Sequence, residues 1–190
     1  MKLNNLIIDD FLDDPDGIRK VVLDTGIEFF DRVGYFTGKR TPSVDNIDYQ
    51  NMIIEKLERV LPFKIKMWPL SFSFQLCLDR DETHLHLDPS DWTGVLYLTP
   101  NALIGSGTLL FKEDVKLVKK LKEYNENEEE NPSISEGKVR ADVMSTLGNV
   151  YNRLVLLRGK EIPHRSNIPG FGDCLENGRL TQVFFFDEVM

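Results

Sequence analysis

The stretch that decides the fold is Thr83-His84-Leu85-His86-Leu87-Asp88 (THLHLD, residues 83–88), in which polar and apolar side chains alternate. On a β-strand, residues two apart point to the same face. His84, His86 and Asp88 would therefore project together, while Leu85 and Leu87 would face the opposite side. Burial of the two leucines would fix the register of the strand. The stretch thus predicts a strand that holds imidazoles and a carboxylate rigidly on one face.

Strand-like runs continue on both sides of this stretch. They are rich in β-branched and aromatic residues and are separated by turn residues. We expect strands at residues 3–9, 71–78, 83–88, 93–99, 107–111, 149–159, 161–166 and 179–189. The count of seven or eight short strands is typical of an all-β sandwich or jelly roll.

Two helices are expected before most of these strands. Asp14-Pro15 is typical of an N-cap followed by proline in the first turn, and Gly26 can end that helix. After Ser43, apolar residues recur at helical spacing until Pro62, which ends the second helix. Helices followed by strands predict a mainly β domain with N-terminal helices packed on one sheet.

Two segments interrupt this pattern. Residues 31–43 are polar and contain glycine, which predicts a loop. Residues 112–142 begin with a helical pattern and continue as an acidic loop, which predicts an insertion or a lid. Since the chain has 190 residues, we expect one domain, 1–190, that carries this insertion.

The composition limits the possible partners. The net charge is −8, so nucleic-acid binding through phosphate neutralisation is not expected. No apolar run reaches the roughly 18 residues that a membrane span requires. The polar start MKLNN is unlike a signal peptide, and two isolated cysteines form no disulfide framework. We therefore expect a cytoplasmic protein that interacts with neither nucleic acid nor membrane.

His86 and Asp88 form a candidate metal site with a third, distant ligand. An imidazole and a carboxylate two residues apart on a strand can bind one ion from one side. His164, which ends a later predicted strand, is the remaining candidate histidine. Two histidines and one carboxylate on one face of an ion form the facial triad of non-haem Fe(II) oxygenases, which leaves positions open for other ligands.

A possible anion site opens the last predicted strand. Arg179 and Thr181 share a face by the period of two. A guanidinium can pair with a carboxylate through two parallel hydrogen bonds, and a neighbouring hydroxyl can add another. A dicarboxylate could then bind the metal at one end and Arg179 at the other.

The segment HLDPSDWTGVLYLTPNALIGSGTLLF (residues 86–111) resembles the core of the 2-oxoglutarate/Fe(II)-dependent dioxygenases, in particular the prolyl 4-hydroxylase-like branch. RLVLLRGKEIPHRS (153–166) and RLTQVFFF (179–186) continue the match, so that the resemblance covers about residues 71–187. The resemblance implies a double-stranded β-helix, which is a cupin-like jelly roll. It also implies that Fe(II) is held by His86, Asp88 and His164.

The resemblance also implies the co-substrates and the reaction. Arg179 and Thr181 would hold 2-oxoglutarate, with Tyr97 as a further contact. Hydroxylation of a C–H bond would consume O₂ and release succinate and CO₂, as the cofactor chemistry requires. The substrate would be a peptide side chain or a small molecule, for which we name Trp92, Asn152 and Arg165 as candidate contacts.

Three other interpretations compete with the oxygenase. His84-x-His86-x-Asp88 is similar to part of a zinc-hydrolase motif, but Pro89 stands where that motif needs another histidine. The acidic residues between Asp79 and Asp91 could bind Ca²⁺, although they lack the spacing of an EF-hand loop. The chain could also be a non-catalytic jelly-roll module that binds metal or a partner.

Overall fold

The structure is a computed structural model, and it describes residues 3–31, 37–126 and 141–189. Its helices are α1 (Pro15–Asp24), α2 (Ile47–Val60) and α3 (Val115–Glu126), with a short 3₁₀ helix, η1 (Ile104–Ser106). Its strands are β1 (Asn5–Ile8), β2 (Phe30–Asp31), β3 (Lys39–Ser43), β4 (Lys64–Met67), β5 (Ser73–Cys77), β6 (Trp92–Tyr97), β7 (Thr108–Phe111), β8 (Val143–Leu147), β9 (Leu154–Leu157), β10 (His164–Ser166) and β11 (Arg179–Val189).

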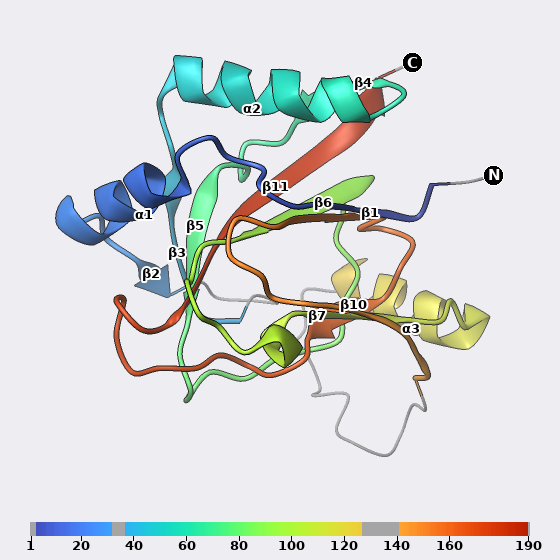
Figure 1. Ribbon diagram of the computed structural model, residues 1–190. Coiled ribbons are helices and arrows are strands. Elements are labelled where there is room, and N and C mark those ends of the chain that lie inside the picture. Colours follow the sequence, from blue (N-terminus) through green and yellow to red (C-terminus); the bar gives the residue numbers. More distant parts are fainter. Residues whose placement is uncertain (1–2, 32–36, 127–140, 190) are drawn as a thin grey trace.

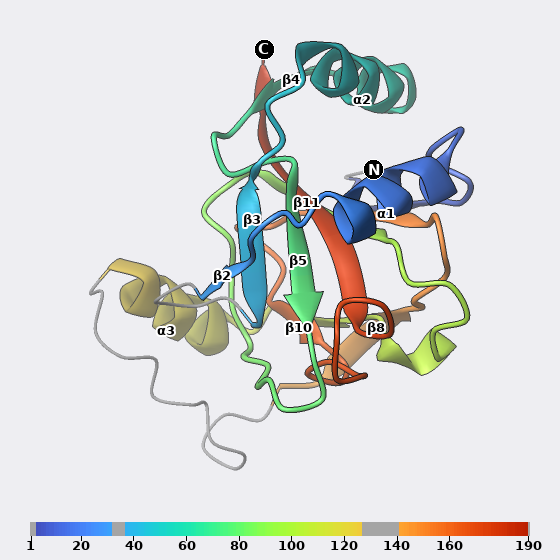
Figure 2. The same cartoon turned by 90° about the vertical axis from the view of Figure 1, so that its left-hand side faces the viewer.

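The strands form two antiparallel sheets (Figures 1 and 2). The major sheet has the order β1-β9-β6-β11-β5-β3-β2, and β4 pairs with the far end of β11. The minor sheet has the order β10-β7-β8. Residues of both sheets line one pocket between them. This two-layer, mainly β arrangement with flanking helices confirms the predicted jelly roll, the double-stranded β-helix.

Alternate side chains of β11 point to opposite faces of the major sheet, one set toward the core and the other toward the pocket. Phe184 and Phe186 are fully buried in the main hydrophobic core, whereas Phe185 lines the pocket. Helices α1 and α2 cover the outer face of the major sheet, where Ile53 and Leu57 of α2 join the same core (Figure 1). One face of the sheet is therefore free to carry functional side chains toward the minor sheet.

Both predicted N-terminal helices are present, and the first begins with the expected cap. The Asp14 side chain accepts a hydrogen bond from the Gly17 N–H, and Pro15 occupies the first turn of α1. The second helix begins later than predicted, at Ile47, because Asn46 rather than Ser43 caps it. The Asn46 side chain accepts from the Tyr49 N–H at 3.0 Å.

The predicted loop 31–43 is wrong in part, because it contains β3 and the end of β2. Gly38 and Pro42 favour a loop locally, yet the segment pairs with β5 on one side and with β2 on the other. The register shifts between Arg40 and Ser43, around Pro42, as expected where a proline interrupts a ladder. Pairing with a distant strand thus overrides the local turn signals, and the prediction also missed β4 and β8.

The stretch 83–88 does not form the continuous strand that we predicted, because its one ladder contact is an isolated bridge between His86 and His164. The predicted alternation nevertheless holds. Leu85 and Leu87 are buried in a separate hydrophobic cluster with Leu117 and Leu121 of α3. Helix α3, the described beginning of the predicted insertion 112–142, thus packs behind the metal-ligand stretch. The acidic loop expected after it falls on residues 127–140, outside the described part.

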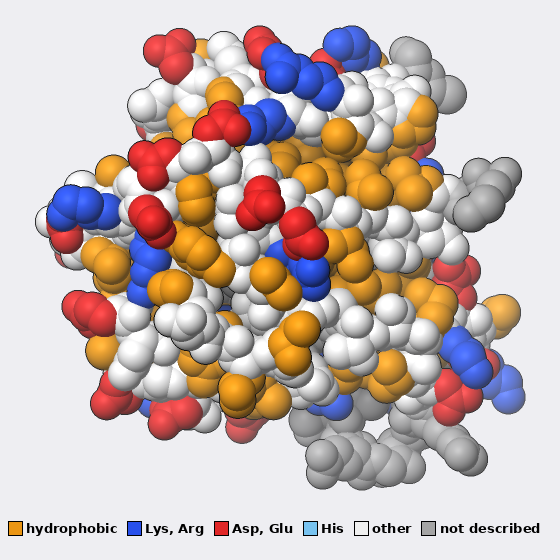
Figure 3. All heavy atoms as spheres, in the orientation of Figure 1, with side chains coloured by type: hydrophobic (Ala, Val, Ile, Leu, Met, Phe, Trp, Pro, Cys, Tyr) orange, Lys and Arg blue, Asp and Glu red, His pale blue; other side chains and the backbone are white. Residues whose placement is uncertain are grey.

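No helix within residues 3–31, 37–126 and 141–189 is long and apolar enough to cross a membrane. On the face shown in Figure 3, acidic and basic side chains alternate around apolar ones, and no broad basic patch is visible.

Candidate metal centre and pocket

Two backbone hydrogen bonds bring the two distant histidines together. The His86 N–H donates to the His164 carbonyl oxygen at 3.1 Å, and the His164 N–H donates to the His86 carbonyl oxygen at 3.0 Å. The imidazole rings lie side by side, with centroids 4.4 Å apart. The register of this single bridge therefore determines the spacing of the candidate ligands.

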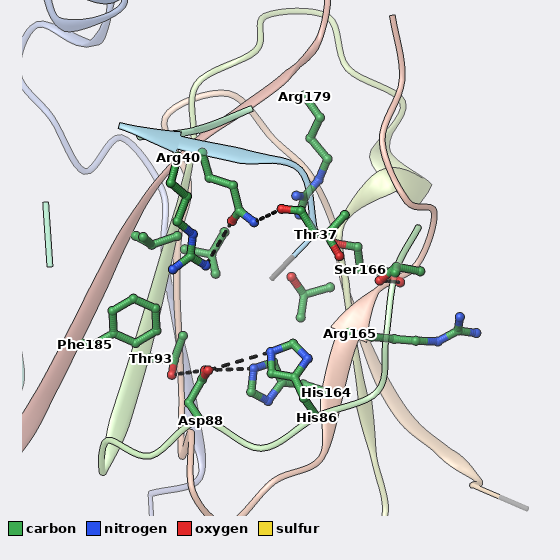
Figure 4. Close-up of a pocket in the computed structure, with 15 residues that line it drawn as sticks. Thr37, Arg40, His86, Asp88, Thr93, His164, Arg165, Ser166, Arg179 and Phe185 are labelled. Carbon is green, nitrogen blue, oxygen red and sulfur yellow. Dashed lines mark hydrogen bonds and ion pairs between the residues drawn. The ribbon is translucent and has the colours of Figure 1, made fainter. Parts of the chain in front are cut away.

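The donor atoms of His86, Asp88 and His164 converge on one point (Figure 4). Nε2 of His164 lies 3.0 Å from Oδ2 of Asp88, and Nε2 of His86 lies 3.7 Å from Oδ1. All three donors lie within 4.8 Å of one another. Two ligands at about 2.1 Å from an ion and at right angles are about 3 Å apart. The three side chains therefore fit one divalent ion, bound on one face.

Both imidazoles are held in the tautomer that metal binding requires. Nδ1 of His86 donates to the His84 carbonyl oxygen at 2.8 Å, and Nδ1 of His164 donates to the Ile162 carbonyl oxygen at 2.9 Å. A carbonyl oxygen can only accept, so each Nδ1 carries a proton and each Nε2 is left to bind an ion. The carbonyl partners also fix the orientation of the rings.

The charges of the three groups are strongly coupled. Burial, the largest cause, and the neighbouring His164 lower the pKa of His86 to about 4. Burial alone would lower the pKa of His164, but the Asp88 carboxylate beside it raises that pKa overall. Burial alone would raise the pKa of Asp88, yet both histidines and Thr93 hold it well below its usual range. The site thus keeps Asp88 ionised and favours a cation beside it.

Thr93 of β6 fixes the carboxylate from behind. Its hydroxyl donates to Oδ2 of Asp88, and both side chains are buried. Hydrogen bonds of this kind orient metal ligands and support their affinity. No sequence signal pointed to Thr93, because β6 is buried on both faces and its residues show no alternation of exposure.

The triad lies in a pocket between the two sheets (Figure 4). The major sheet contributes residues of β3, β5, β6 and β11, and the minor sheet contributes residues of β7 and β10. The lining comprises Thr37, Arg40, Gln75, Thr83, His86, Asp88, Thr93, Val95, Thr108, His164, Arg165, Ser166, Arg179, Val183 and Phe185.

Arg179 and Thr181 lie on the pocket face of β11, as the period of two predicted. Both are buried, and Arg179 lines the pocket. The Arg179 guanidinium lies over the Tyr97 ring at 5.6 Å, and its Nε donates to the Ser106 carbonyl oxygen at 3.3 Å. The buried Thr181 hydroxyl has no hydrogen-bond partner among the described residues. Thr181 is not among the residues that line the pocket, but a buried hydroxyl without a described partner, two residues from Arg179 on the same face of β11, fits a carboxylate ligand held by both.

The predicted contact Tyr97 lies behind Arg179 rather than in the pocket itself. Its side chain is fully buried, and its hydroxyl shares a hydrogen bond of 2.8 Å with the hydroxyl of Thr108, which lines the pocket. Tyr97 can therefore support Arg179 and Thr108.

Two of the three predicted substrate contacts lie outside the pocket. Trp92 is fully buried in the main core, because its position in β6 points to the helix-covered face. Asn152 has a positive φ of 61° and bonds the backbone N–H and carbonyl of Leu12, so its side chain anchors the N-terminal segment. These placements correct our expectation for Trp92 and Asn152. Arg165 does line the pocket, although its side chain points away from the triad, over Phe111 (Figure 4).

Among the charged and amide side chains that line the pocket, sequence reasoning missed two, Arg40 and Gln75. Nη2 of Arg40 lies 3.5 Å from Oε1 of Gln75, and Nε2 of Gln75 donates to the Thr37 carbonyl oxygen. Gln75 follows the alternation of residues 71–78 and could have been identified. Arg40 stands in the segment that we predicted to be a loop, so no periodic signal pointed to it.

The alternative metal sites are not assembled in the part of the chain that the structure describes. The one group of three or more potential ligands found there is the triad. His84 lies outside this group, with its Nε2 at 3.9 Å from Glu82. The set expected for a zinc hydrolase and the acidic set expected for Ca²⁺ are therefore absent from that part.

Comparisons with known proteins reveal similarity at the level of the fold. No protein-family model matches the sequence, and no curated protein is significantly similar to it. Among solved structures, HygX from Streptomyces hygroscopicus, with nickel and 2-oxoglutarate bound, has a TM-score of 0.61 at 12% identity, covering 98% of this chain and 84% of HygX.

Two further structures agree with this result. A prolyl hydroxylase from Trichoplax adhaerens, in complex with a peptide fragment of hypoxia inducible factor, has a TM-score of 0.58 at 14% identity, covering 96% of this chain and 83% of the hydroxylase. A 2OG-Fe(II) oxygenase family oxidoreductase from Burkholderia pseudomallei has a TM-score of 0.52 at 10% identity, covering 96% of this chain and 84% of the oxidoreductase. The chain thus has the fold of the 2-oxoglutarate/Fe(II) oxygenases over nearly its whole length.

Proposed function

We propose that the protein is an Fe(II)- and 2-oxoglutarate-dependent oxygenase that hydroxylates a C–H bond of a peptide side chain or a small molecule. The observation that carries this proposal is the convergence of His86, Asp88 and His164 in the pocket that Arg179 also lines. The fold similarity supports it, since HygX has been solved with iron and with nickel and 2-oxoglutarate. A metal site of this donor set leaves positions open for further ligands.

In this proposal, His86, Asp88 and His164 hold Fe(II), and Arg179 with Thr181 grips the distal carboxylate of 2-oxoglutarate. When bound, Fe(II) would activate O₂, which is the oxidant, and 2-oxoglutarate would be oxidised to succinate and CO₂ as the substrate C–H bond is hydroxylated. The protein supplies orientation and exclusion of water. The carbonyl groups of His84 and Ile162 hold a proton on each Nδ1, so that Nε2 is the nitrogen that would bind the ion, and Thr93 holds Asp88 in place.

Arg179 would orient 2-oxoglutarate, because it is held from two sides. The ring of Tyr97 lies against its guanidinium, and Ser106 accepts from its Nε. The Thr181 hydroxyl would complete the contact by donating to the same carboxylate. Arg165, at the pocket lining, stays our candidate for a substrate contact at the rim.

An anaerobic titration tests the proposal. Fe(II) is added to the metal-free protein, 2-oxoglutarate follows, and the visible spectrum is recorded. A weak band near ~500 nm is expected for an iron–2-oxoglutarate chelate on a facial triad. In Arg179→Gln, half-saturation is expected to need about 30-fold more 2-oxoglutarate, because truncating one partner of a buried charge pair costs roughly 2 kcal/mol or more.

The matched control is Arg59→Gln, which removes the same charge from an exposed position on α2. Its titration should follow that of the wild type. If the wild type binds Fe(II) but forms no band, or if Arg179→Gln titrates like the wild type, the non-catalytic jelly-roll module is the better interpretation. If the band forms, a screen for substrates that stimulate succinate release identifies the substrate.

A further inference from the structure

The pocket contains a second buried guanidinium, Arg40, that the proposed reaction does not use. Arg40 belongs to β3, on the opposite side of β5 from β11, and it is only 5% exposed. Its guanidinium lies 5.4 Å from the centre of the Phe185 ring and points into the pocket toward the triad (Figure 4). Arg179 enters the same pocket from another side.

The position of Arg40 is fixed by the backbone before it. Gly38 has φ +72° and packs against β5, where an added Cβ would lie 2.2 Å from the Leu76 carbonyl oxygen. The Thr37 carbonyl accepts from the Gln75 side chain, whose Oε1 faces Arg40. The turn therefore directs the Arg40 side chain inward.

The other charged groups of the pocket already have a task in the proposed complex or point elsewhere. Asp88 would bind Fe(II), and Arg179 would hold the distal carboxylate of 2-oxoglutarate. Arg165 lines the pocket but points away from the triad. Among the cationic side chains of the described pocket lining, Arg40 therefore faces the triad without a task in the proposed reaction.

We infer that Arg40 binds an anionic group of the primary substrate, a carboxylate or a phosphate, beside the metal. This inference rests on the proposed function and deepens it by naming the substrate class. A guanidinium presents paired donors that match both kinds of anion, and it does so most strongly where water is excluded.

The inference is tested with small probes on protein loaded with Co(II) and saturated with 2-oxoglutarate. The probes are acetate and methyl phosphate, with acetamide as the neutral counterpart of acetate. Binding is followed at the Arg40 Nε–H resonance in ¹⁵N–¹H spectra, which Arg40→Lys identifies by its loss. A saturable shift is expected with at least one anion and not with acetamide. Comparison of the two anions distinguishes a carboxylate from a phosphate ester.

Variants supply the second readout, which is probe affinity by calorimetry. Arg40→Gln should weaken anion binding at least tenfold, and Arg40→Lys should retain part of it because it keeps the charge. The control is Lys39→Gln, which removes a charge from the adjacent residue, whose side chain pairs with Asp31 at 3.2 Å. That control should bind the anions like the wild type. Equal shifts with acetate and acetamide, or unchanged anion affinity in Arg40→Gln, would overturn the inference.

The affinity for 2-oxoglutarate separates this inference from the proposed function. Arg40→Gln should bind 2-oxoglutarate within twofold of the wild type. A loss as large as that of Arg179→Gln would mean that Arg40 holds the co-substrate, and the inference would be wrong. Failure of the wild type to bind 2-oxoglutarate would instead reject the proposed function. The anion titration, repeated on metal-loaded protein without 2-oxoglutarate, would then still decide whether Arg40 binds an anion.

Discussion

At the scale of single residues, the candidate metal centre depends on hydrogen bonds that hold each ligand before any ion binds. The Nδ1 atoms of His86 and His164 donate to backbone carbonyls, and Asp88 accepts from Thr93. Because the ligand side chains are already held in place, little free energy is spent on ordering them when the ion binds. Polar groups behind the ligands thus contribute to affinity as well as the ligands themselves.

Removal of one ligand should abolish stabilisation by metal. At a free Co(II) concentration about 100 times Kd, the wild type should gain about 2.7 kcal/mol in free energy of unfolding. His164→Ala should gain almost nothing, and a chelator should reverse the gain of the wild type. The control is His84→Ala, because the His84 side chain lies outside the ligand group. Thermal unfolding with and without Co(II) measures all of these, and equal gains in His164→Ala and the wild type would refute the site.

Loss of the hydroxyl behind Asp88 should weaken metal binding without removing a ligand. Thr93→Val keeps the shape of the side chain but leaves Asp88 without this donor. We expect the Kd for Co(II) to rise about 10-fold, the lower end for partners of metal ligands. Thr93→Ser retains the hydroxyl and should bind nearly as the wild type does. Competition titration with a chromophoric chelator gives each Kd, and an unchanged Kd in Thr93→Val would contradict the expectation.

At the scale of elements, helix α3 supports the ligand stretch from outside. Residues 83–88 have a single ladder contact, the bridge at His86, and a further backbone hydrogen bond from the Asp88 N–H to the Gly159 carbonyl oxygen. The packing of Leu85 and Leu87 supports the stretch from the other face. Leu117 and Leu121 of α3 form the opposite side of that cluster. A segment predicted as an insertion therefore helps to position the candidate metal site.

Truncation of that contact should affect both stability and the metal site. Leu117→Ala removes a side chain that is only 1% exposed, so the free energy of unfolding should fall by about 2–4 kcal/mol. Co(II) affinity should fall as well, because the ligand stretch loses its support. Leu103→Ala, at a residue that is 75% exposed, is the matched control and should change stability by less than about 0.5 kcal/mol. Urea unfolding and Co(II) titration of both variants test this, and a destabilised Leu117→Ala with unchanged metal affinity would limit α3 to a structural contribution.

At the scale of the whole molecule, an ion pair joins two segments that are far apart in the sequence and lie next to the paired strands β1 and β9. Asp9 follows β1 and accepts from Nε and Nη2 of Arg153, which precedes β9. The hydrogen bond from Arg153 holds the pKa of Asp9 below its usual value. A depressed carboxyl pKa contributes stability that is fully present above the unfolded pKa of about 3.9 and is lost as pH falls through the folded pKa.

The pH dependence of unfolding should show this pair. Asp9→Asn should unfold at a lower urea concentration than the wild type at pH 7, and the two curves should converge as pH falls below about 3.9. Asp79→Asn, which removes the same charge from an exposed position, is the control and should change little at either pH. A difference between Asp9→Asn and the wild type that is constant with pH would show that the ionisation of Asp9 is not its cause.

Similarity in overall fold does not identify the substrate. HygX and the prolyl hydroxylase share this fold at 12% and 14% identity, and the latter was solved with a peptide. The site therefore has to be argued from its own residues, since a fold supports many substrates. Among these residues, Arg40 points toward the triad and Arg165 points away from it.

The sequence by itself determined the chemistry and the spacing of the candidate ligands. The period of two in a strand is a local property, so it placed Arg179 with Thr181 and His86 with Asp88 before any contact was known. The start of α1 was equally local, because Asp14 and Pro15 act on the turn beside them. These are features in which neighbouring residues decide the outcome.

Only the tertiary structure decided which face of a strand meets which layer. β6 is buried on both faces, so its pattern could not tell that Trp92 points to the core and Thr93 to the pocket. Arg40 enters the pocket because β3 pairs with β5, a strand more than thirty residues away, against the local preference for a loop. Contacts between residues far apart in the chain carry no local pattern, and they alone assemble the walls of the site.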